Sequence, residues 1–117
     1  MEPFDSKKRK NPEAIIQEAI IEMLELKGWF VKVTHGNMYQ SGFPDLFVCH
    51  QLYGPRWVEV KKPGFKGSKF TIAQVRDFPL FCSNGSGVWV LTAATKREYE
   101  KLFDDYNWWT YLSVFRT

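Results

Sequence analysis

Cysteine and histidine are scarce in this chain of 117 residues, which has two of each. Cys49 and Cys82 lack CxxC spacing and paired histidines, so the pattern argues against a zinc site. Both lie among apolar residues rather than in a cysteine-rich framework. We therefore expect two reduced, buried thiols in a protein of the cytoplasm.

Long hydrophobic runs are also missing. No apolar stretch approaches the length of a transmembrane helix, and the opening residues "MEPFDSKKRKNPE" lack the hydrophobic region of a signal peptide. These absences predict a cytoplasmic, intracellular protein without a membrane partner.

The residues that are present favour one folded domain with a basic leader. Hydrophobic residues make up 44% of the chain, which is sufficient for a core, and the net charge of +3 permits a nucleic-acid partner. We expect residues 1–10 to be a flexible leader and residues 11–117 to form a single domain. The basic run from Lys7 to Lys10 is either a solvated tail or an arm that contacts DNA phosphates.

Residues 11–28, "NPEAIIQEAIIEMLELKG", predict a helix with signals at both ends. Asn11 is a favourable N-cap, Pro12 suits the first helical position, and Gly28 is suited to end the helix. At 100° per residue, Glu13 and Gln17 fall on the apolar side. Three other acids fall on the opposite side, which we expect to be solvated: Glu18, Glu22 and Glu25.

The remaining pattern alternates strands and helices. Strands are predicted over residues 29–34, 45–50, 56–61 and 87–92, and further helices over 71–81 and 94–106. Thr71 is the predicted cap of the second helix, and Pro79 is expected to disturb it. The order αβββαβα predicts an α/β domain with strands and helices mixed.

An unusual charge pattern marks the third predicted strand. Trp57, Glu59 and Lys61 share one face because side chains alternate, while Val58 and Val60 face the core. Asp45 begins the preceding strand of the predicted hairpin and can point to the same face as Glu59, and the inward Glu13 can complete the cluster. Clustered carboxylates suit Mg²⁺ or Mn²⁺, and a lysine beside them can stabilise charge at a phosphorus atom. This is the equipment of a phosphodiester hydrolase.

The ordered motifs resemble the VRR-NUC (virus-type replication-repair nuclease) family of the PD-(D/E)xK superfamily. The matching stretches are "PEAIIQEAI", "GFPD", "WVEVKKPG" and "TIAQ", and the resemblance covers residues 11–92. It implies a restriction-endonuclease-like core in αβββαβ order, with a mixed central sheet flanked by helices, similar to Holliday-junction resolvases. It also implies a bacterial or phage protein of replication and repair.

The resemblance implies roles for individual residues. Asp45 and Glu59, with the carbonyl oxygen of Val60, would hold Mg²⁺ or Mn²⁺, and Lys61 would be the catalytic lysine. Glu13 and Gln17 both match acids of related patterns, so either one could approach the metal. Gln74 would lie near the site, although a Pro common in its motif is replaced here: the stretch reads "FTIAQ".

The expected activity is metal-dependent endonucleolytic cleavage of DNA, with branched or structured DNA such as four-way junctions as substrate. Paired cuts would call for a homodimer, and we expect part of the aromatic tail from Asn107 to serve as core or as subunit interface. The alternative is a nucleic-acid-binding module without turnover on the same fold. The predicted DNA contacts are Lys7, Lys8, Arg9, Lys10, His35, Lys62, Lys66 and Lys69.

Overall fold

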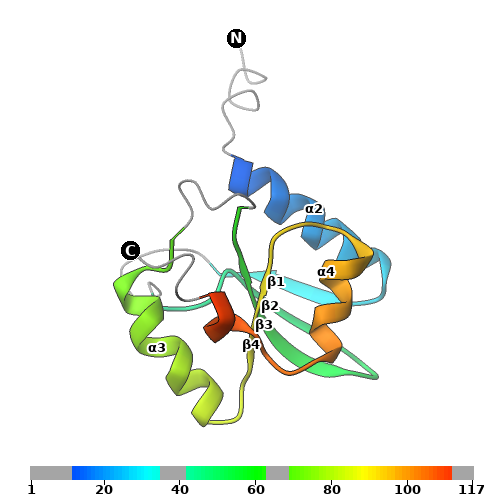
Figure 1. Cartoon of the computed structure of the whole chain (residues 1–117). Coiled ribbons are helices and arrows are strands. Elements are labelled where there is room, and N and C mark those ends of the chain that lie inside the picture. Colours follow the sequence, from blue (N-terminus) through cyan, green and yellow to red (C-terminus); the bar gives the residue numbers. More distant parts are fainter. Residues whose placement is uncertain (1–11, 35–41, 63–68, 112–117) are drawn as a thin grey trace.

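A computed structural model describes residues 12–34, 42–62 and 69–111. A four-stranded mixed sheet in the order β1-β2-β3-β4 forms its centre (Figure 1). Strand β2 (Leu46–His50) runs antiparallel to both β1 (Phe30–Val33) and β3 (Gly54–Val60). Strand β4 (Val88–Leu91) runs parallel to β3. The expected order of elements and the α/β class are confirmed.

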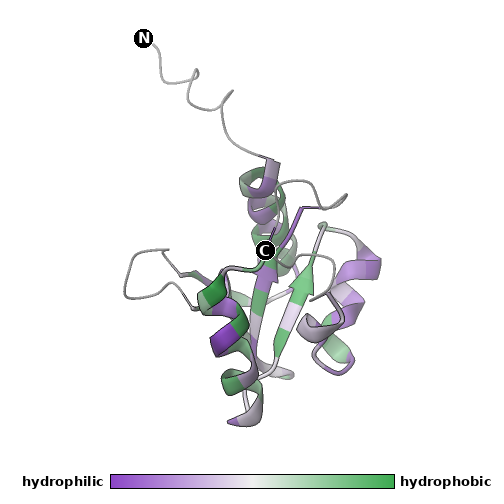
Figure 2. Cartoon of the chain, turned by 60° about the vertical axis from the view of Figure 1, so that its left-hand side comes forward, coloured by the Kyte–Doolittle hydropathy of each residue, from purple (hydrophilic) through white to green (hydrophobic). Residues whose placement is uncertain are grey.

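Helices lie on both faces of this sheet (Figure 1). On one face, α2 (Pro12–Leu26) and the 3₁₀ turn η1 (Lys101–Phe103), which continues α4 (Lys96–Glu100), pack on Val58 and Val60. On the other face, α3 (Ile72–Ser83) and the 3₁₀ turn η2 (Trp108–Tyr111) enclose a second apolar cluster around Phe70 and Phe78. In Figure 2 the strands are largely hydrophobic, whereas the helices mix hydrophilic and hydrophobic residues.

The second cluster covers the other face of β3. Val58 and Val60 face the first core cluster as predicted, and Trp57, on the opposite face, packs against the second cluster. Glu59 and Lys61 are therefore only 2% and 3% exposed. Their charges are held inside the protein, where an electrostatic interaction is stronger than in water.

The ends of the first helix follow from its sequence. Helix α2 starts at Pro12, and Gly28 follows it with φ at +92°, a conformation that glycine adopts without strain. Trp29 N–H donates to the Leu24 carbonyl at 3.0 Å, and Gly28 N–H to the Glu25 carbonyl at 3.1 Å. These two bonds form the Schellman motif, which also places Trp29 in the core beside Leu24.

The later helices depart from expectation in length. Pro79 lies inside α3 without ending it, and the helix continues to Ser83. The third predicted helix, over residues 94–106, is instead the five-residue α4 followed by the 3₁₀ turn η1. Its N-cap is Thr95, whose hydroxyl accepts a hydrogen bond from Glu98 N–H at 3.2 Å. None of the described helices is long and apolar enough to cross a membrane.

Both cysteines are free thiols, as predicted, but each is half-buried rather than fully buried. The aromatic tail is divided between core and surface. Trp108 is buried beside Phe78, whereas Trp109 is 60% exposed. The Asn107 amide closes part of the free edge of β4, because its oxygen accepts a hydrogen bond from Val90 N–H at 2.7 Å.

Candidate active site

The cluster of charged residues forms where β2 begins and β3 ends. In the antiparallel register Leu46 lies opposite Val58, so Asp45, just before β2, comes next to Glu59. Asp45 and Glu59 both project from the face that α3 covers, because side chains alternate along the two strands. The sheet therefore brings together the residues that the sequence separates by a strand, a turn and most of another strand.

Hydrogen bonds lock the two carboxyl groups into one network. The Asp45 side chain accepts through Oδ2 from Val60 N–H at 2.8 Å, and Asp45 N–H donates to Glu59 Oε1 at 3.1 Å. The other Glu59 oxygen, Oε2, accepts from the Gln74 amide at 3.0 Å and lies 3.1 Å from Lys61 Nζ. Lys61 Nζ also donates to the Lys69 carbonyl.

Helix α3 holds Gln74 in this network through its capping box. Thr71 caps the helix by accepting from Gln74 N–H at 3.0 Å, and the Gln74 side-chain oxygen accepts from Thr71 N–H at 3.1 Å. The side-chain oxygen of Gln74 is thereby fixed, so its amide nitrogen is directed at Glu59. The start of the helix and the charged cluster thus share one side chain.

Burial strongly perturbs both carboxyl groups. Desolvation raises the pKa of Asp45 to about 6, against the lowering effect of the Val60 N–H and of Lys61, and Glu13 adds to the rise. Desolvation and the nearby Asp45 charge raise the pKa of Glu59 to about 8, although Lys61 and Gln74 stabilise its ionised form. Two buried carboxyl groups that resist ionisation together are a feature of functional sites.

Helix α2 has the rotation that the sequence predicts. Glu13 and Gln17 are half-buried, whereas Glu18, Glu22 and Glu25 are exposed. Glu13 lies near enough to Asp45 to raise the pKa of that carboxyl group. The helix therefore brings Glu13 toward the cluster, and no comparable effect of Gln17 on Asp45 or Glu59 occurs within the described residues.

The donor atoms suit a hard divalent cation, although two carboxylates alone make a sparse site. No group of three His, Cys, Asp or Glu side chains within residues 12–34, 42–62 and 69–111 is arranged to hold a metal. The charges of Asp45 and Glu59 nevertheless repel each other, because the Asp45 charge raises the pKa of Glu59, and a cation would relieve this repulsion. Asp45 Oδ1 accepts no hydrogen bond from the described part of the chain, and so it can serve as a ligand.

The predicted DNA contacts are described only in part. Lys62 is half-buried and Lys69 is exposed. Both lie in the segment of the sequence between Lys61 and α3. His35, Lys66 and the run Lys7, Lys8, Arg9 and Lys10 lie outside the described residues, as does Asn11.

Two contributions to the site were not predicted from the sequence. One is the Lys69 backbone carbonyl, which holds Lys61 Nζ. The other is the close approach of Gly42 to α3, where an added Cβ would come within 1.9 Å of an Asp77 carboxylate oxygen. A glycine just before the Phe-Pro-Asp motif was a visible signal for a tight approach, whereas nothing in the sequence marks a backbone carbonyl.

Comparisons with known proteins agree with this geometry. No protein-family model and no curated protein matches the sequence. Among solved structures, a chain described as a "VRR_NUC domain" matches with a TM-score of 0.65 and 27% sequence identity, over 83% of this chain and 100% of that chain. The likeness spans the whole of the matched domain, and its fold is of the nuclease type. In its fold, and with its motif residues gathered at one point, the chain is similar to a VRR-NUC domain.

Proposed function

We propose that this protein is an Mg²⁺- or Mn²⁺-dependent endonuclease that hydrolyses phosphodiester bonds of DNA. The observation that carries the proposal is the network around Glu59, which accepts from Asp45 N–H at 3.1 Å and lies 3.1 Å from Lys61 Nζ. A binding module needs cations to hold phosphates, but it has no use for a half-buried Asp45 and a buried Glu59 whose pKa values are both raised. Such an arrangement costs stability, so its presence favours a catalytic use.

Asp45 and Glu59, with the Val60 carbonyl oxygen, are the residues that would hold the metal. A bound divalent cation supplies charge neutralisation at a phosphoryl oxygen and a lowered pKa for bound water. Glu13 is the candidate for a further contact, directly or through water, because it is the α2 acid whose charge reaches Asp45.

Lys61 would act on the reacting phosphate from a fixed position, and Gln74 would hold the neighbouring Glu59. The Lys61 ammonium is held by Glu59 and the Lys69 carbonyl, so its charge is placed before the substrate binds. A preorganised cation of this kind stabilises negative charge that develops in the transition state. Gln74 keeps Glu59 oriented through a 3.0 Å hydrogen bond.

The substrate we propose is branched or structured DNA, including four-way junctions, cut by a homodimer. The net charge of +3 favours a phosphate-rich partner. Lys62 and Lys69 lie next to the carboxyl cluster, where they can contact phosphates on either side of the cleaved bond. Lys66, His35 and the basic leader remain candidates for further contacts.

A panel of labelled DNAs tests the proposal. Duplex, single-stranded, flap and four-way-junction DNA would be incubated with the protein in Mg²⁺, in Mn²⁺ and in EDTA. We expect cleavage only with metal, and its loss in Asp45→Ala and Glu59→Ala at undiminished DNA binding. DNA binding without cleavage of any substrate in either metal would support the alternative, a nucleic-acid-binding module on a nuclease fold.

A further inference from the structure

The face of the sheet that carries the carboxyl cluster continues into an aromatic surface. Four rings make this surface: Phe43, Phe47, Trp57 and Phe81. Trp57 contacts each of the other three, with ring centroids 4.9 Å from Phe47, 5.2 Å from Phe81 and 5.6 Å from Phe43. All four residues are only half-buried, so the protein's own core does not fully use them.

The aromatic surface is contiguous with the proposed site. Phe47 follows Asp45 by two residues on one strand, and Trp57 precedes Glu59 by two on the next, so each pair shares a face. Two residues of a strand span about 7 Å. Phe47 and Trp57 therefore lie about one or two nucleotides from a phosphate held at the carboxyl groups.

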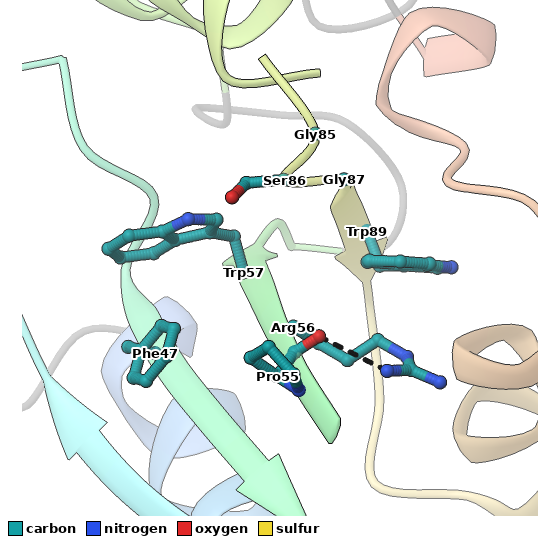
Figure 3. A pocket seen from close by; sticks show the side chains of 8 residues that line it. All are labelled: Phe47, Pro55, Arg56, Trp57, Gly85, Ser86, Gly87 and Trp89. Carbon is teal, nitrogen blue, oxygen red and sulfur yellow. Dashed lines mark hydrogen bonds between the residues drawn. The ribbon is translucent and has the colours of Figure 1, made fainter. Parts of the chain in front are cut away.

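A hollow of about 300 Å³ opens beside these rings. Phe47 and Trp57 line one side of it, and Arg56 and Trp89 line the opposite side (Figure 3). Pro55 lies between the two sides, and the turn Gly85–Gly87 lies above them in this view. The Ser86 side chain turns its hydroxyl toward Trp57 (Figure 3) and makes no hydrogen bond within the described residues. A planar ring would find apolar faces in this hollow and a hydroxyl at its rim.

The charge around the aromatic surface suits a polyanion. Lys32 lies directly opposite Phe47 in the β1–β2 register, on the same face, and is exposed. None of the residues that line the hollow is acidic. Besides Asp45 and Glu59, the described acids on this face include Asp77 of α3, which lies against Gly42 and forms an ion pair with Arg76 at 2.7 Å.

We propose that this surface binds unpaired nucleobases of the DNA strand next to the cleaved bond, by stacking on Phe47 and Trp57. The inference rests on the proposed nuclease function and adds a substrate class to it: DNA with a single-stranded segment beside the cut. Aromatic stacking accepts every base, because each has a π-face, so little sequence preference is expected. Lys32 contacts the phosphate that joins the stacked bases.

Binding in EDTA tests this inference apart from cleavage. The probes are a dT oligonucleotide of about 12 nucleotides, within the site sizes of such surfaces, and a blunt duplex of equal length. Phe47→Leu keeps apolar volume and removes the aromatic face. We expect it to weaken dT binding by about fivefold or more, the loss of one stacked base, with duplex binding within about twofold.

Two further variants test the phosphate contact and serve as a control. Lys32→Gln alters an exposed side chain and should reduce the salt dependence of dT binding by about one counterion. Leu26→Ala changes a residue of α2 that is 84% exposed, on the other side of the sheet, and should match wild type. A 2-aminopurine base in the oligonucleotide should lose less fluorescence on binding Phe47→Leu than on binding wild type.

The outcomes are separable. Equal losses for dT and duplex in Phe47→Leu, or no loss for either, would overturn the stacking site. So would a change in sedimentation of Phe47→Leu without a selective loss of dT binding, which would assign the surface to a second copy of the chain. If DNA is still cut in Mg²⁺, only this inference fails. If wild type neither cuts nor binds DNA, the proposed function fails with it.

Discussion

Asp45 and Glu59 are neighbouring acids, one half-buried and the other buried. Asp45 N–H donates to Glu59 Oε1 at 3.1 Å, and each carboxyl group has a raised pKa because burial disfavours its ionised form. In the unfolded chain both groups ionise near their ordinary values. The folded protein therefore becomes less stable as pH rises from about 4, through about 6 for Asp45 and about 8 for Glu59.

Asp45→Asn should weaken this pH dependence while preserving the local hydrogen bonds. The amide oxygen can still accept from Val60 N–H, but the charge beside Glu59 is gone. In EDTA we expect the variant to exceed wild type in free energy of unfolding by at least about 2 kcal/mol at pH 8, and by much less at pH 5. Urea denaturation at both pH values measures the difference.

The same variant should lose DNA cleavage by at least about 100-fold, because the site then has one carboxylate fewer for a metal. Mg²⁺ should stabilise wild type at pH 8 and stabilise Asp45→Asn far less. A variant that gains equal stability at pH 5 and pH 8 would show that Asp45 is not the source of the charge strain.

The role that we propose for Lys61 is to stabilise charge in the transition state rather than to assemble the site. Its ammonium contacts Glu59 and the Lys69 carbonyl and is 3% exposed. Lys61→Ala should lower the cleavage rate by about 100-fold or more at every Mg²⁺ concentration. A titration of Mg²⁺ against rate checks this. Full recovery of the rate at high Mg²⁺ would assign Lys61 to site assembly alone.

At the scale of elements, two helices that are far apart in the sequence each contribute a side chain near the carboxyl groups. Helix α3 contributes Gln74, which the capping box with Thr71 holds against Glu59. Helix α2 contributes Glu13, whose charge raises the pKa of Asp45. The first turns of both helices come to the end of β3, so the cluster depends on how the helices pack and not on the strands alone.

The rotation of α2 makes a paired test. Glu13 is half-buried and Glu18 is exposed, although both belong to the first two turns of the same helix. Glu13→Gln should slow cleavage or raise the Mg²⁺ concentration needed for half-maximal rate. Glu18→Gln, the matched control, should alter neither the rate nor the free energy of unfolding beyond roughly 0.5 kcal/mol. Mg²⁺ titrations measure both variants, and an effect of Glu18→Gln without one of Glu13→Gln would contradict the assignment of Glu13 to the site.

At the scale of the whole molecule, β4 and the end of β3 are buried on both faces, whereas β1 is largely exposed, and several large apolar side chains stay at the surface. Trp108 fills the cluster against Phe78, but Trp109 in the same 3₁₀ turn is 60% exposed, and Leu80 on α3 is 55% exposed. The Asn107 side chain occupies part of the β4 edge, which opposes pairing of that edge with another sheet. A partner copy would therefore pack on exposed side chains rather than extend the sheet.

We expect a two-fold homodimer in solution, with a mass about twice the 13.8 kDa of the chain. Trp109→Ser should shift the protein toward monomer and lower paired cutting of four-way junctions. Leu52→Ser, at a position that is 74% exposed in the β2–β3 turn, is the control and should remain dimeric. Light scattering at micromolar concentration, with and without junction DNA, measures both. A monomer under all conditions would leave a nicking enzyme without paired cuts.

The sequence by itself determined the elements and the membership of the charged cluster. Caps such as Thr71 and Gly28 act within one or two turns of a helix, and strand alternation places Glu59 and Lys61 on one face, so local patterns suffice for both. The rotation of α2 followed in the same way from its apolar side. The length of the third helix did not, because a 3₁₀ turn replaced its second half.

Only the tertiary structure decided how deeply the cluster is buried and what holds it. The second apolar layer, from α3 and Trp108, covers the face of β3 that carries Glu59. The resulting burial raises the pKa values of Asp45 and Glu59. The Lys69 carbonyl reaches Lys61, and Gly42 meets Asp77, across gaps that no local pattern records. Burial and backbone contacts depend on how distant segments pack, whereas caps and alternation depend on neighbouring residues alone.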